Sequence, residues 1–261
     1  MQTVLLSLLC LLLSSHVAWA KVQTKTIPYQ HGDLSLEGFL AWDDAGEGPR
    51  PGVLVVHEWW GLNDYARQRA QQLAELGYVA FAMDMYGVGK VTTHPDQAGA
   101  WMKQVQANVS QWQARAIKGL AVLRSQEFVD TNRIAAIGYC FGGATVVELA
   151  YSGADIRGAV SFHGSLPLPN LKTVRRTKAK LLLAHGNLDP FVKEEHARKF
   201  RNALDKAKID WQMVIYAGAR HSFTNPGADA YGMKALQYNK QADERSWQHM
   251  QLFFDEIFQA S

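Results

Sequence analysis

Hydrophobic residues follow two alternating patterns along the chain, short continuous runs and longer stripes with helical spacing. The runs, broken by few polar residues, cover 52–56, 78–83, 158–162 and 180–184. Runs of this length are typical of parallel strands that are covered on both faces. Stripes with a period near 3.6 predict helices over 64–76, about 95–127, about 193–206 and about 242–259. This alternation predicts an α/β fold with a mostly parallel central sheet and helices on both faces.

Strands are also predicted before the first of these runs and after the last one. Val22–Tyr29 and Leu34–Trp42 alternate apolar and polar residues on either side of a His-Gly-Asp turn, and Trp211–Tyr216 forms the last strand. The sequence contains neither an internal repeat nor a linker. Residues 21–261 are therefore predicted to form a single domain.

The first twenty residues have a different character. Val4–Leu13 is apolar but too short to cross a bilayer, and Ala18-Trp19-Ala20 has the small-x-small pattern of a signal-peptide cleavage site. Residues 1–20 are thus predicted to be removed. We expect an exported, periplasmic or secreted protein that has no stable membrane anchor and begins at Lys21.

Composition narrows the possible partners. The chain has 261 residues, of which 48% are hydrophobic and 20% are charged, and its net charge is +3. These values are ordinary for a globular protein, and the basic stretch from Lys172 to Lys180 resembles a solvated loop. A nucleic-acid partner is not expected. We expect a monomer, with a dimer as the alternative.

A glycine-rich bend stands between an apolar run and an apolar helix. It reads Gly138-Tyr-Cys140-Phe-Gly142-Gly, and small residues at such a strand-to-helix bend allow a nucleophile to adopt a strained backbone conformation. Loss of Cys10 with the signal segment leaves Cys140 without a disulfide partner. The thiol is then either inert and buried or reactive, and its position at the bend favours a nucleophile.

A base and an orienting acid follow the bend in the sequence. Asp189 comes just after the run at 180–184, and His221 comes just after the strand ending at Tyr216. Each could serve only its own loop, Asp189 by starting a turn and His221 as a surface residue. Together they follow the order nucleophile, acid, histidine, each beyond a strand end where parallel strands meet at one sheet edge. We therefore predict a Cys140–His221–Asp189 triad.

Five segments resemble the dienelactone hydrolase family of α/β-hydrolases over nearly the whole mature length. They are Val55–Asn63, Met83–Gly87, Gly138–Gly143, Gly186–Asp189 and His221–Phe223. The resemblance implies an α/β-hydrolase fold and hydrolysis of a small ester or lactone through an acyl-thiol intermediate, without a metal or an organic cofactor. It also implies that Glu58 hydrogen-bonds the resting thiol. The backbone N–H groups of Trp59 and Phe141 would form the oxyanion hole.

The resemblance fails at the substrate carboxylate. Family members that act on dienelactone carry two arginines, whereas this chain reads Gly87-Val88-Gly89 and Thr224-Asn225 at the corresponding places. Lys90 and Arg220 are possible replacements. Trp60, Tyr86 and Phe223 are predicted to bind the substrate, and with Trp59 and Phe141 they suggest an apolar or aromatic acyl group. Alternatively, these aromatic residues only fill the space between loops and sheet.

Three other functions are compatible with parts of the sequence. Histidines end several strands and could suggest a metal site, at His57, His163, His185 and His221. They lack a closely spaced ligand pair, so structural roles are favoured and no metal is predicted. A non-catalytic ligand-binding protein with the hydrolase fold and a thioesterase are the remaining alternatives.

Overall fold

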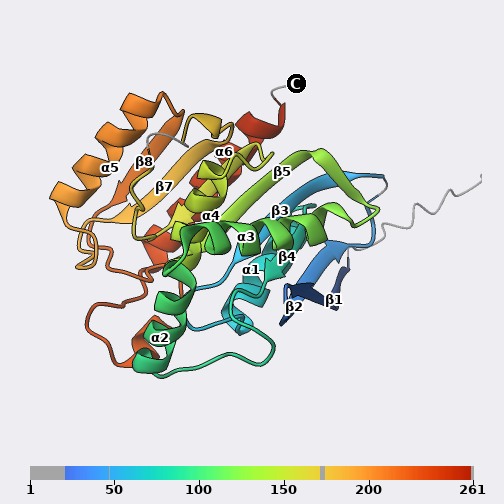
Figure 1. Ribbon diagram of the computed structural model, residues 1–261, viewed down its shortest axis with the longest axis horizontal. Helices are drawn as coiled ribbons and strands as arrows, with labels where there is room; N and C mark the ends of the chain where they lie inside the picture. Colours follow the sequence, from blue (N-terminus) through green and yellow to red (C-terminus); the bar gives the residue numbers. More distant parts are fainter. Residues whose placement is uncertain (1–20, 47, 171–173, 260–261) are drawn as a thin grey trace, which may run out of the picture.

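The computed structural model describes residues 21–46, 48–170 and 174–259, so the predicted signal segment lies outside the described residues. One sheet of eight strands crosses the molecule in the order β1-β2-β4-β3-β5-β6-β7-β8 (Figure 1). The strands are β1 (Val22–His31), β2 (Leu34–Asp43), β3 (Arg50–Val56), β4 (Val79–Met83), β5 (Val129–Tyr139), β6 (Gly158–Phe162), β7 (Lys180–Gly186) and β8 (Trp211–Tyr216). The pairs β1–β2 and β2–β4 are antiparallel. Every other pair is parallel, which confirms the predicted fold class.

Helices cover both faces of this sheet and explain its continuous apolar runs. The helices α3 (Val109–Arg124), α4 (Phe141–Tyr151) and α5 (Glu194–Ala207) share one hydrophobic core, and α1 (Asp64–Glu75) and α6 (Lys240–Gln259) share the other. Within β3, Leu54 and Val56 enter the first core, whereas Val53 and Val55 enter the second. Because successive side chains of a strand point to opposite faces, a strand between two helical layers is apolar throughout.

The long helix expected over about 95–127 is two helices. α2 (Pro95–Gln106) ends before Asn108, whose Oδ1 accepts a hydrogen bond of 3.1 Å from the backbone N–H of Gln111 and so begins α3. An asparagine in this capping position satisfies a free N–H of the new helix. The apolar stripe continues across the break, and the stripe alone therefore suggested one helix. α2 projects beyond the sheet at the bottom of Figure 1.

Two 3₁₀ turns, η1 (Val174–Arg176) and η2 (Ala228–Tyr231), complete the described elements. Among the helices of the described ranges, none combines the length and the apolar character needed to span a membrane. The parallel strands from β3 to β8 all end at the same edge of the sheet. The loops that follow these strands carry the residues predicted for catalysis.

Candidate active site

Cys140 occupies a sharp turn between β5 and α4. Its backbone has φ 54° and ψ −115°, a region that residues with side chains rarely adopt. The glycines on either side permit this conformation: a Cβ at Gly138 would overlap the carbonyl oxygen of Gly142, and one at Gly142 would overlap that of Val56 in β3. The elbow therefore needs Gly142 for contact with the neighbouring strand, a role that the sequence did not indicate.

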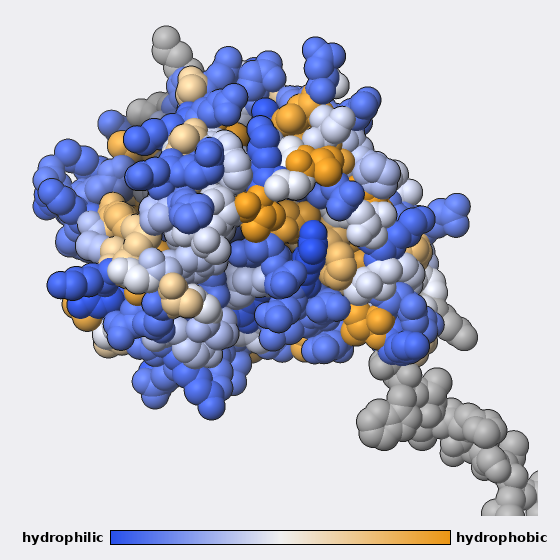
Figure 2. Space-filling view, turned by 90° about the horizontal axis from the view of Figure 1, so that it is seen from below, coloured by the Kyte–Doolittle hydropathy of each residue, from blue (hydrophilic) through white to orange (hydrophobic). Residues whose placement is uncertain are grey.

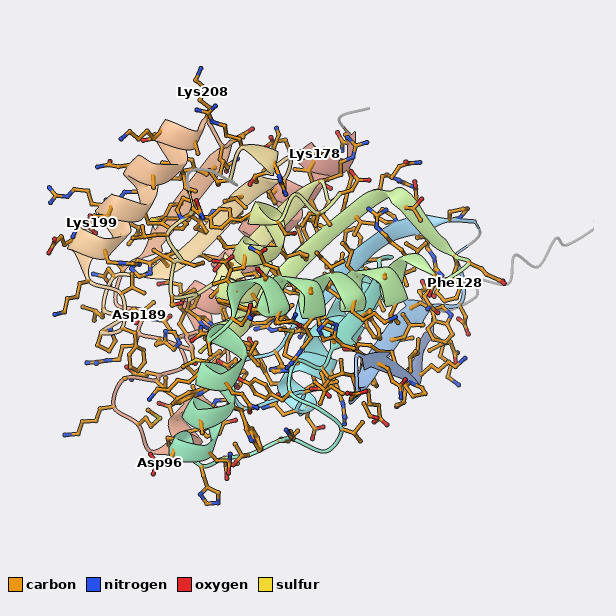
Figure 3. The ribbon with its side chains drawn as sticks, in the orientation of Figure 1. Asp96, Phe128, Lys178, Asp189, Lys199 and Lys208 are labelled. Atoms are coloured by element: carbon orange, nitrogen blue, oxygen red, sulfur yellow. The ribbon has the colours of Figure 1, made fainter. Side chains whose placement is uncertain are left out.

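The acid and the histidine are hydrogen-bonded to each other. Nδ1 of His221 lies 2.7 Å from Oδ2 of Asp189, and both side chains are buried. Asp189 lies in the loop between β7 and α5 (Figure 3), where its Oδ1 accepts a bond of 2.9 Å from the N–H of Phe191. It therefore serves its own turn and the imidazole together. The ring of His221 also interacts electrostatically with Cys140, and both residues line the same cavity, so the structure brings the three predicted residues together.

Opposing electrostatic effects act on the pKa of the His221 imidazole. Burial disfavours its charged form, but the charge of Cys140 and hydrogen bonds to Asp189 and Cys140 outweigh burial and raise the pKa of His221 to about 10. Burial also opposes the charge of Asp189, yet its bond to His221 and the charge of that ring lower the pKa of the carboxyl group. The imidazole of His221 is therefore protonated at neutral pH, and the Asp189 carboxylate beside it is ionised.

The two predicted oxyanion donors lie beside this group. Phe141 is the first residue of α4, where backbone N–H groups have no acceptor within the helix. Trp59 lies in the turn after β3, and it lines the same cavity as Phe141 and Cys140. Across the described ranges, no hydrogen bond uses the N–H of either residue. Both groups are available to a substrate oxygen.

Glu58 is buried, and each of its carboxylate oxygens has a partner. Oε1 accepts a bond of 2.6 Å from the hydroxyl of Ser222, and Oε2 accepts one of 2.6 Å from the amide of Asn225. Burial raises the pKa of Glu58, and the two bonds and the charge of His221 act against that shift. The carboxylate thus joins the β3 loop to the loop of His221. Its predicted bond to the thiol stays a prediction.

The other strand-end histidines have separate environments. His57 is buried, its Nε2 accepts a bond of 3.1 Å from the N–H of Met85, and burial lowers its pKa. His163 stands edge-to-face with His221, with ring centres 5.2 Å apart, and burial lowers the pKa of His185 too. Within the parts of the chain that the structure describes, no three His, Cys, Asp or Glu residues are grouped so as to hold a metal ion.

A cavity of about 220 Å³ opens over the thiol. Its wall includes Cys140 and His221, together with two polar residues and six apolar ones: Gln106, Ser165, Trp59, Met102, Phe141, Phe191, Met233 and Leu236. Figure 2 looks at the molecule from the side on which α2 lies, and hydrophobic side chains are exposed near the centre of that face among hydrophilic ones. Besides His221, the cavity wall carries no charged side chain among the described residues.

The remaining predicted substrate residues do not line this cavity. Trp60 is fully buried and stacks on Tyr231 with ring centres 4.0 Å apart, and Phe223 is also fully buried. Tyr86 is buried against Phe141 and borders a separate hollow of about 60 Å³ together with Lys90. These aromatic residues therefore lie in the protein interior and not in the cavity wall.

The two candidate replacements for the missing arginines also lie elsewhere. Lys90 borders the small hollow beside Tyr86, and Arg220 borders a surface hollow, where its guanidinium donates to the carbonyl of Lys234. Neither contributes to the wall of the cavity over Cys140. In this structure no lysine or arginine of the described chain takes the place of the family's arginines.

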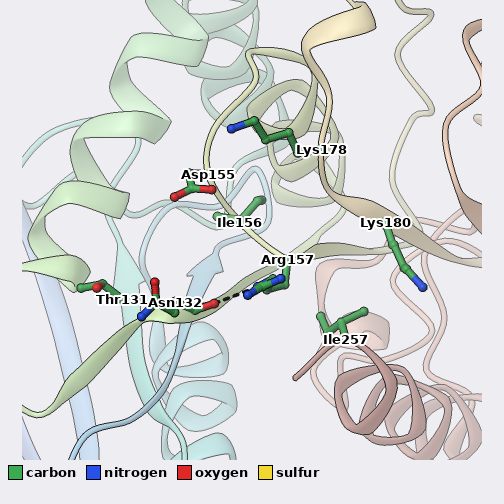
Figure 4. A pocket seen from close by; sticks show the side chains of 8 residues that line it. All are labelled: Thr131, Asn132, Asp155, Ile156, Arg157, Lys178, Lys180 and Ile257. Atoms are coloured by element: carbon green, nitrogen blue, oxygen red, sulfur yellow. Dashed lines mark hydrogen bonds between the residues drawn. The ribbon is translucent and has the colours of Figure 1, made fainter. Parts of the chain in front are cut away.

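A larger cavity, of about 330 Å³, lies at the opposite edge of the sheet (Figure 4). Its residues lie at or just before the amino ends of β5, β6 and β7, or on α6. They are Thr131, Asn132, Asp155, Ile156, Arg157, Lys178, Lys180 and Ile257. Active sites of parallel α/β sheets lie at the carboxyl ends of the strands. This charged cavity is therefore separate from Cys140, Asp189 and His221.

Several site residues were not indicated by the sequence. Met102, Gln106 and Met233 enter the cavity wall from α2 and from the segment after η2, both of which lie more than ten residues beyond the end of the preceding strand. Ser222 and Asn225 hold Glu58, and their position next to His221 was the available signal. His163 directly follows β6, and the sequence favoured a structural role for it over a metal ligand without indicating its partners.

Known proteins share both this sequence and this structure. The sequence profile of the dienelactone hydrolase family matches residues 36–258. Two solved structures each have a TM-score of 0.88 and cover 91% of this chain and 99% of their own: a dienelactone hydrolase-like promiscuous phosphotriesterase from metagenomic libraries, 37% identical, and m3DLH, 40% identical. A Saccharolobus solfataricus protein that carries the provisional name carboxymethylenebutenolidase is 26% identical over 89% of this chain and 98% of its own. The chain belongs to the dienelactone hydrolase family of α/β-hydrolases.

Proposed function

We propose that this protein is an exported hydrolase that cleaves a small ester or lactone through a Cys140–His221–Asp189 triad. The observation that carries the proposal is the buried Asp189–His221 hydrogen bond, whose imidazole lines the same largely apolar cavity as Cys140. Family membership supports the hydrolase activity. The choice of cysteine as nucleophile rests on the strained elbow and on the contact of its thiol with the imidazole.

Acylation begins with attack of the Cys140 thiolate on the substrate carbonyl carbon. A carbon–sulfur bond forms, and the N–H groups of Trp59 and Phe141 receive the negative charge of the oxygen. Collapse of this intermediate breaks the bond to the leaving oxygen. Nε2 of His221, the ring nitrogen not bonded to Asp189, gives that oxygen its proton. The products are a thioester and a neutral imidazole.

Deacylation uses the same groups in the opposite direction. Nε2 of His221 takes a proton from water, and the resulting hydroxide attacks the thioester carbon. The carbon–sulfur bond breaks, the acid leaves, and the thiolate and imidazolium form again. Asp189 keeps the ring oriented in both half-reactions through its bond to Nδ1.

The cavity favours an uncharged substrate with an apolar acyl group. A buried carboxylate requires a paired cation, and the wall of this cavity carries none besides His221, which the proposed mechanism employs. A dry cavity of about 150 Å³ accommodates benzene. The volume of about 220 Å³ therefore suits an aromatic ring or a branched alkyl chain of similar size. An apolar neutral acyl donor is expected to be preferred over an anionic one.

A hydrolysis screen tests these proposals. Wild type and Cys140→Ala are compared on matched neutral and anionic aryl esters, lactones and thioesters. We expect turnover of neutral esters or lactones by wild type alone. Equal turnover by both proteins would contradict a cysteine nucleophile, and a preference for anionic esters would contradict the proposed substrate class. Turnover of thioesters alone would favour the thioesterase, and absence of all turnover the binding protein.

The screen can include a neutral phosphotriester, because the metagenomic relative is described as a promiscuous phosphotriesterase. Such a triester also lacks a negative charge and can present apolar groups to the cavity. We expect it to be turned over more slowly than a carboxylic ester, because the proposed acyl-enzyme steps pass through a planar carbonyl carbon. Loss of both activities in Cys140→Ala would place them in one site.

Export is proposed from the first twenty residues alone. Expression of the full chain in a bacterial host, followed by fractionation and N-terminal sequencing, is expected to recover a protein that begins at Lys21 outside the cytoplasm. A cytoplasmic protein that keeps Met1 would contradict this.

A further inference from the structure

The backbone N–H of the nucleophile is held by two acceptors. It donates to the carbonyl oxygen of Phe162 at 3.0 Å and to Nδ1 of His163 at 3.1 Å. His163 is fully buried and directly follows β6, the strand next to the one that ends at the elbow. Its ring is thus a structural neighbour of the thiol-bearing residue, although the proposed mechanism assigns it no proton transfer.

The partners of His163 define its protonation. A backbone N–H can only donate, so Nδ1 accepts and carries no proton. The proton of the neutral ring is then on Nε2, which lies 2.7 Å from Oγ1 of Thr224 and donates to it. Burial and the nearby charge of His221 lower the pKa of His163 well below its usual value, in agreement with a neutral ring.

Thr224 belongs to the loop that carries the catalytic base, three residues after His221. Its Oγ1 is also 2.6 Å from the hydroxyl of Tyr65, and its carbonyl accepts a bond of 2.6 Å from Arg69. Arg69 in turn pairs with Asp243 on α6 in the protein interior. The loop end of the His163 connection is therefore fixed to both α1 and α6.

We propose that His163 is a positioning residue that fixes the backbone of Cys140 relative to the loop of His221. One ring nitrogen holds the nucleophile's N–H and the other holds Thr224. Positive φ angles at Cys140 (54°) and His163 (42°) persist only where surrounding contacts determine them. The inference rests on the proposed triad, because it concerns the geometry between thiol and imidazole.

Two substitutions at position 163 separate the two bonds. His163→Asn places an amide oxygen close to the position of Nδ1 and keeps an acceptor for the N–H of Cys140, and asparagine tolerates a positive φ. His163→Gln places its amide near the position of Nε2 and keeps the donor to Thr224 but loses the acceptor. Thr224→Val preserves shape while it removes the hydroxyl, and it adds no strain at position 163.

The readouts are kcat on a neutral ester, the rate of thiol alkylation by uncharged iodoacetamide, and the unfolding midpoint. We expect His163→Gln to lower kcat and alkylation by about 10- to 100-fold, the scale of a small misplacement of reacting groups. His163→Asn is expected to restore most of both rates. Thr224→Val is expected to lower kcat by a smaller factor than His163→Gln.

Equal losses in the Asn and Gln variants, in parallel with their loss of stability, would overturn the proposal and leave a merely structural histidine. Unchanged rates in His163→Gln and Thr224→Val would overturn it as well. Cys140→Ala in the same assay keeps this inference separate from the proposed function. If Cys140→Ala keeps full turnover, the triad itself fails, whereas inactive Cys140→Ala with fully active His163 variants refutes only the positioning role.

Discussion

Each of the two edges of the sheet carries a cavity, and the two cavities differ in volume, in charge and in the burial of their polar groups. At the amino edge, about 330 Å³ lies among Arg157, Lys178 and Lys180, and Lys180 pairs with Asp210 and Glu256 at the surface. At the carboxyl edge, about 220 Å³ lies over a thiol and a buried imidazole. The smaller cavity lies over the proposed triad.

Burial of polar groups explains this difference. Ion pairs in contact with water contribute about 0–1 kcal/mol, because solvent screens them and the side chains stay mobile. Removal of one partner from a buried pair costs about 3–5 kcal/mol. A fold keeps buried pairs such as Asp189–His221 and bonds such as Glu58–Ser222 only with complete networks around them. Buried polar groups therefore mark the site better than cavity size.

Backbone conformation gives a second contrast. The strained positive φ angles of Cys140, His163 and Ser222 all occur in loops at the carboxyl edge. Such conformations are found preferentially where function requires a fixed side-chain direction. None of the eight residues that line the amino-edge cavity has a positive φ. Lys208 (φ 59°) precedes β8 at the amino edge, but it only ends α5 and is exposed, so strain combined with buried polar groups is found at the carboxyl edge.

The largest effect is expected from loss of the base. His221→Ala is predicted to lower kcat by about 10³- to 10⁴-fold, because both proton transfers lose their carrier. Steady-state assays on a neutral ester measure this, with circular dichroism to confirm folding. A decrease of less than tenfold in a folded variant would show that the imidazole is dispensable and would remove the distinction between the two edges.

Glu58 offers the next largest effect. Glu58→Ala leaves the buried donors of Ser222 and Asn225 unpaired, at a cost of about 1–3 kcal/mol for each. Urea unfolding should report this loss, and kcat should fall because the His221 loop is no longer held. Glu58→Gln keeps one acceptor and should fall between Glu58→Ala and wild type. Faster turnover in either variant would instead indicate that Glu58 restrains the thiol.

The pH dependence of activity gives a more moderate effect. Because the pKa of His221 is raised to about 10, the ring remains protonated and able to supply the leaving group below that value. We expect kcat/KM to be level through pH 8 to 9 and to fall as pH rises through about 10. Parallel stability measurements exclude alkaline unfolding. A fall centred near pH 6.5 to 7 would contradict the raised pKa of His221.

The smallest effect is expected at the amino edge. Lys178→Ala and Arg157→Ala change exposed side chains far from the triad, so kcat/KM should stay within a factor of about two and stability within about 0.5 kcal/mol. The same assays used for His221→Ala provide the comparison. A loss of activity comparable to that of His221→Ala would show that the amino edge is important for catalysis, which would contradict a site at the carboxyl edge alone.

Much of the fold was accessible from the sequence because it follows from local patterns. The apolar runs predicted the buried strands, and the elbow glycines predicted the turn at Cys140. The break at Asn108 was missed because the apolar stripe continues through it. The hydrophobic pattern of a helix or strand indicates which of its faces is buried. It does not indicate which group a polar side chain will bond to in the folded protein.

The site was accessible only where loops follow strands. Cys140, Asp189 and His221 were placed together by the rule that parallel strands end at one edge. Met102 and Met233 reach the cavity from segments more than ten residues beyond a strand end, and the partners of Glu58 depend on the folded loop. Trp60 and Phe223 come from the expected loops but point into the protein, since loop membership does not set side-chain direction.

The most direct test is to trap the acyl group during turnover. Wild type and Cys140→Ala are mixed with an activated neutral aryl ester, quenched in acid within milliseconds, digested and analysed by mass spectrometry. The account predicts the added acyl mass on the peptide that contains Cys140, at a level that rises with the burst of released aryl alcohol. Acyl mass on another residue of an active enzyme, or undiminished turnover in Cys140→Ala, would contradict it.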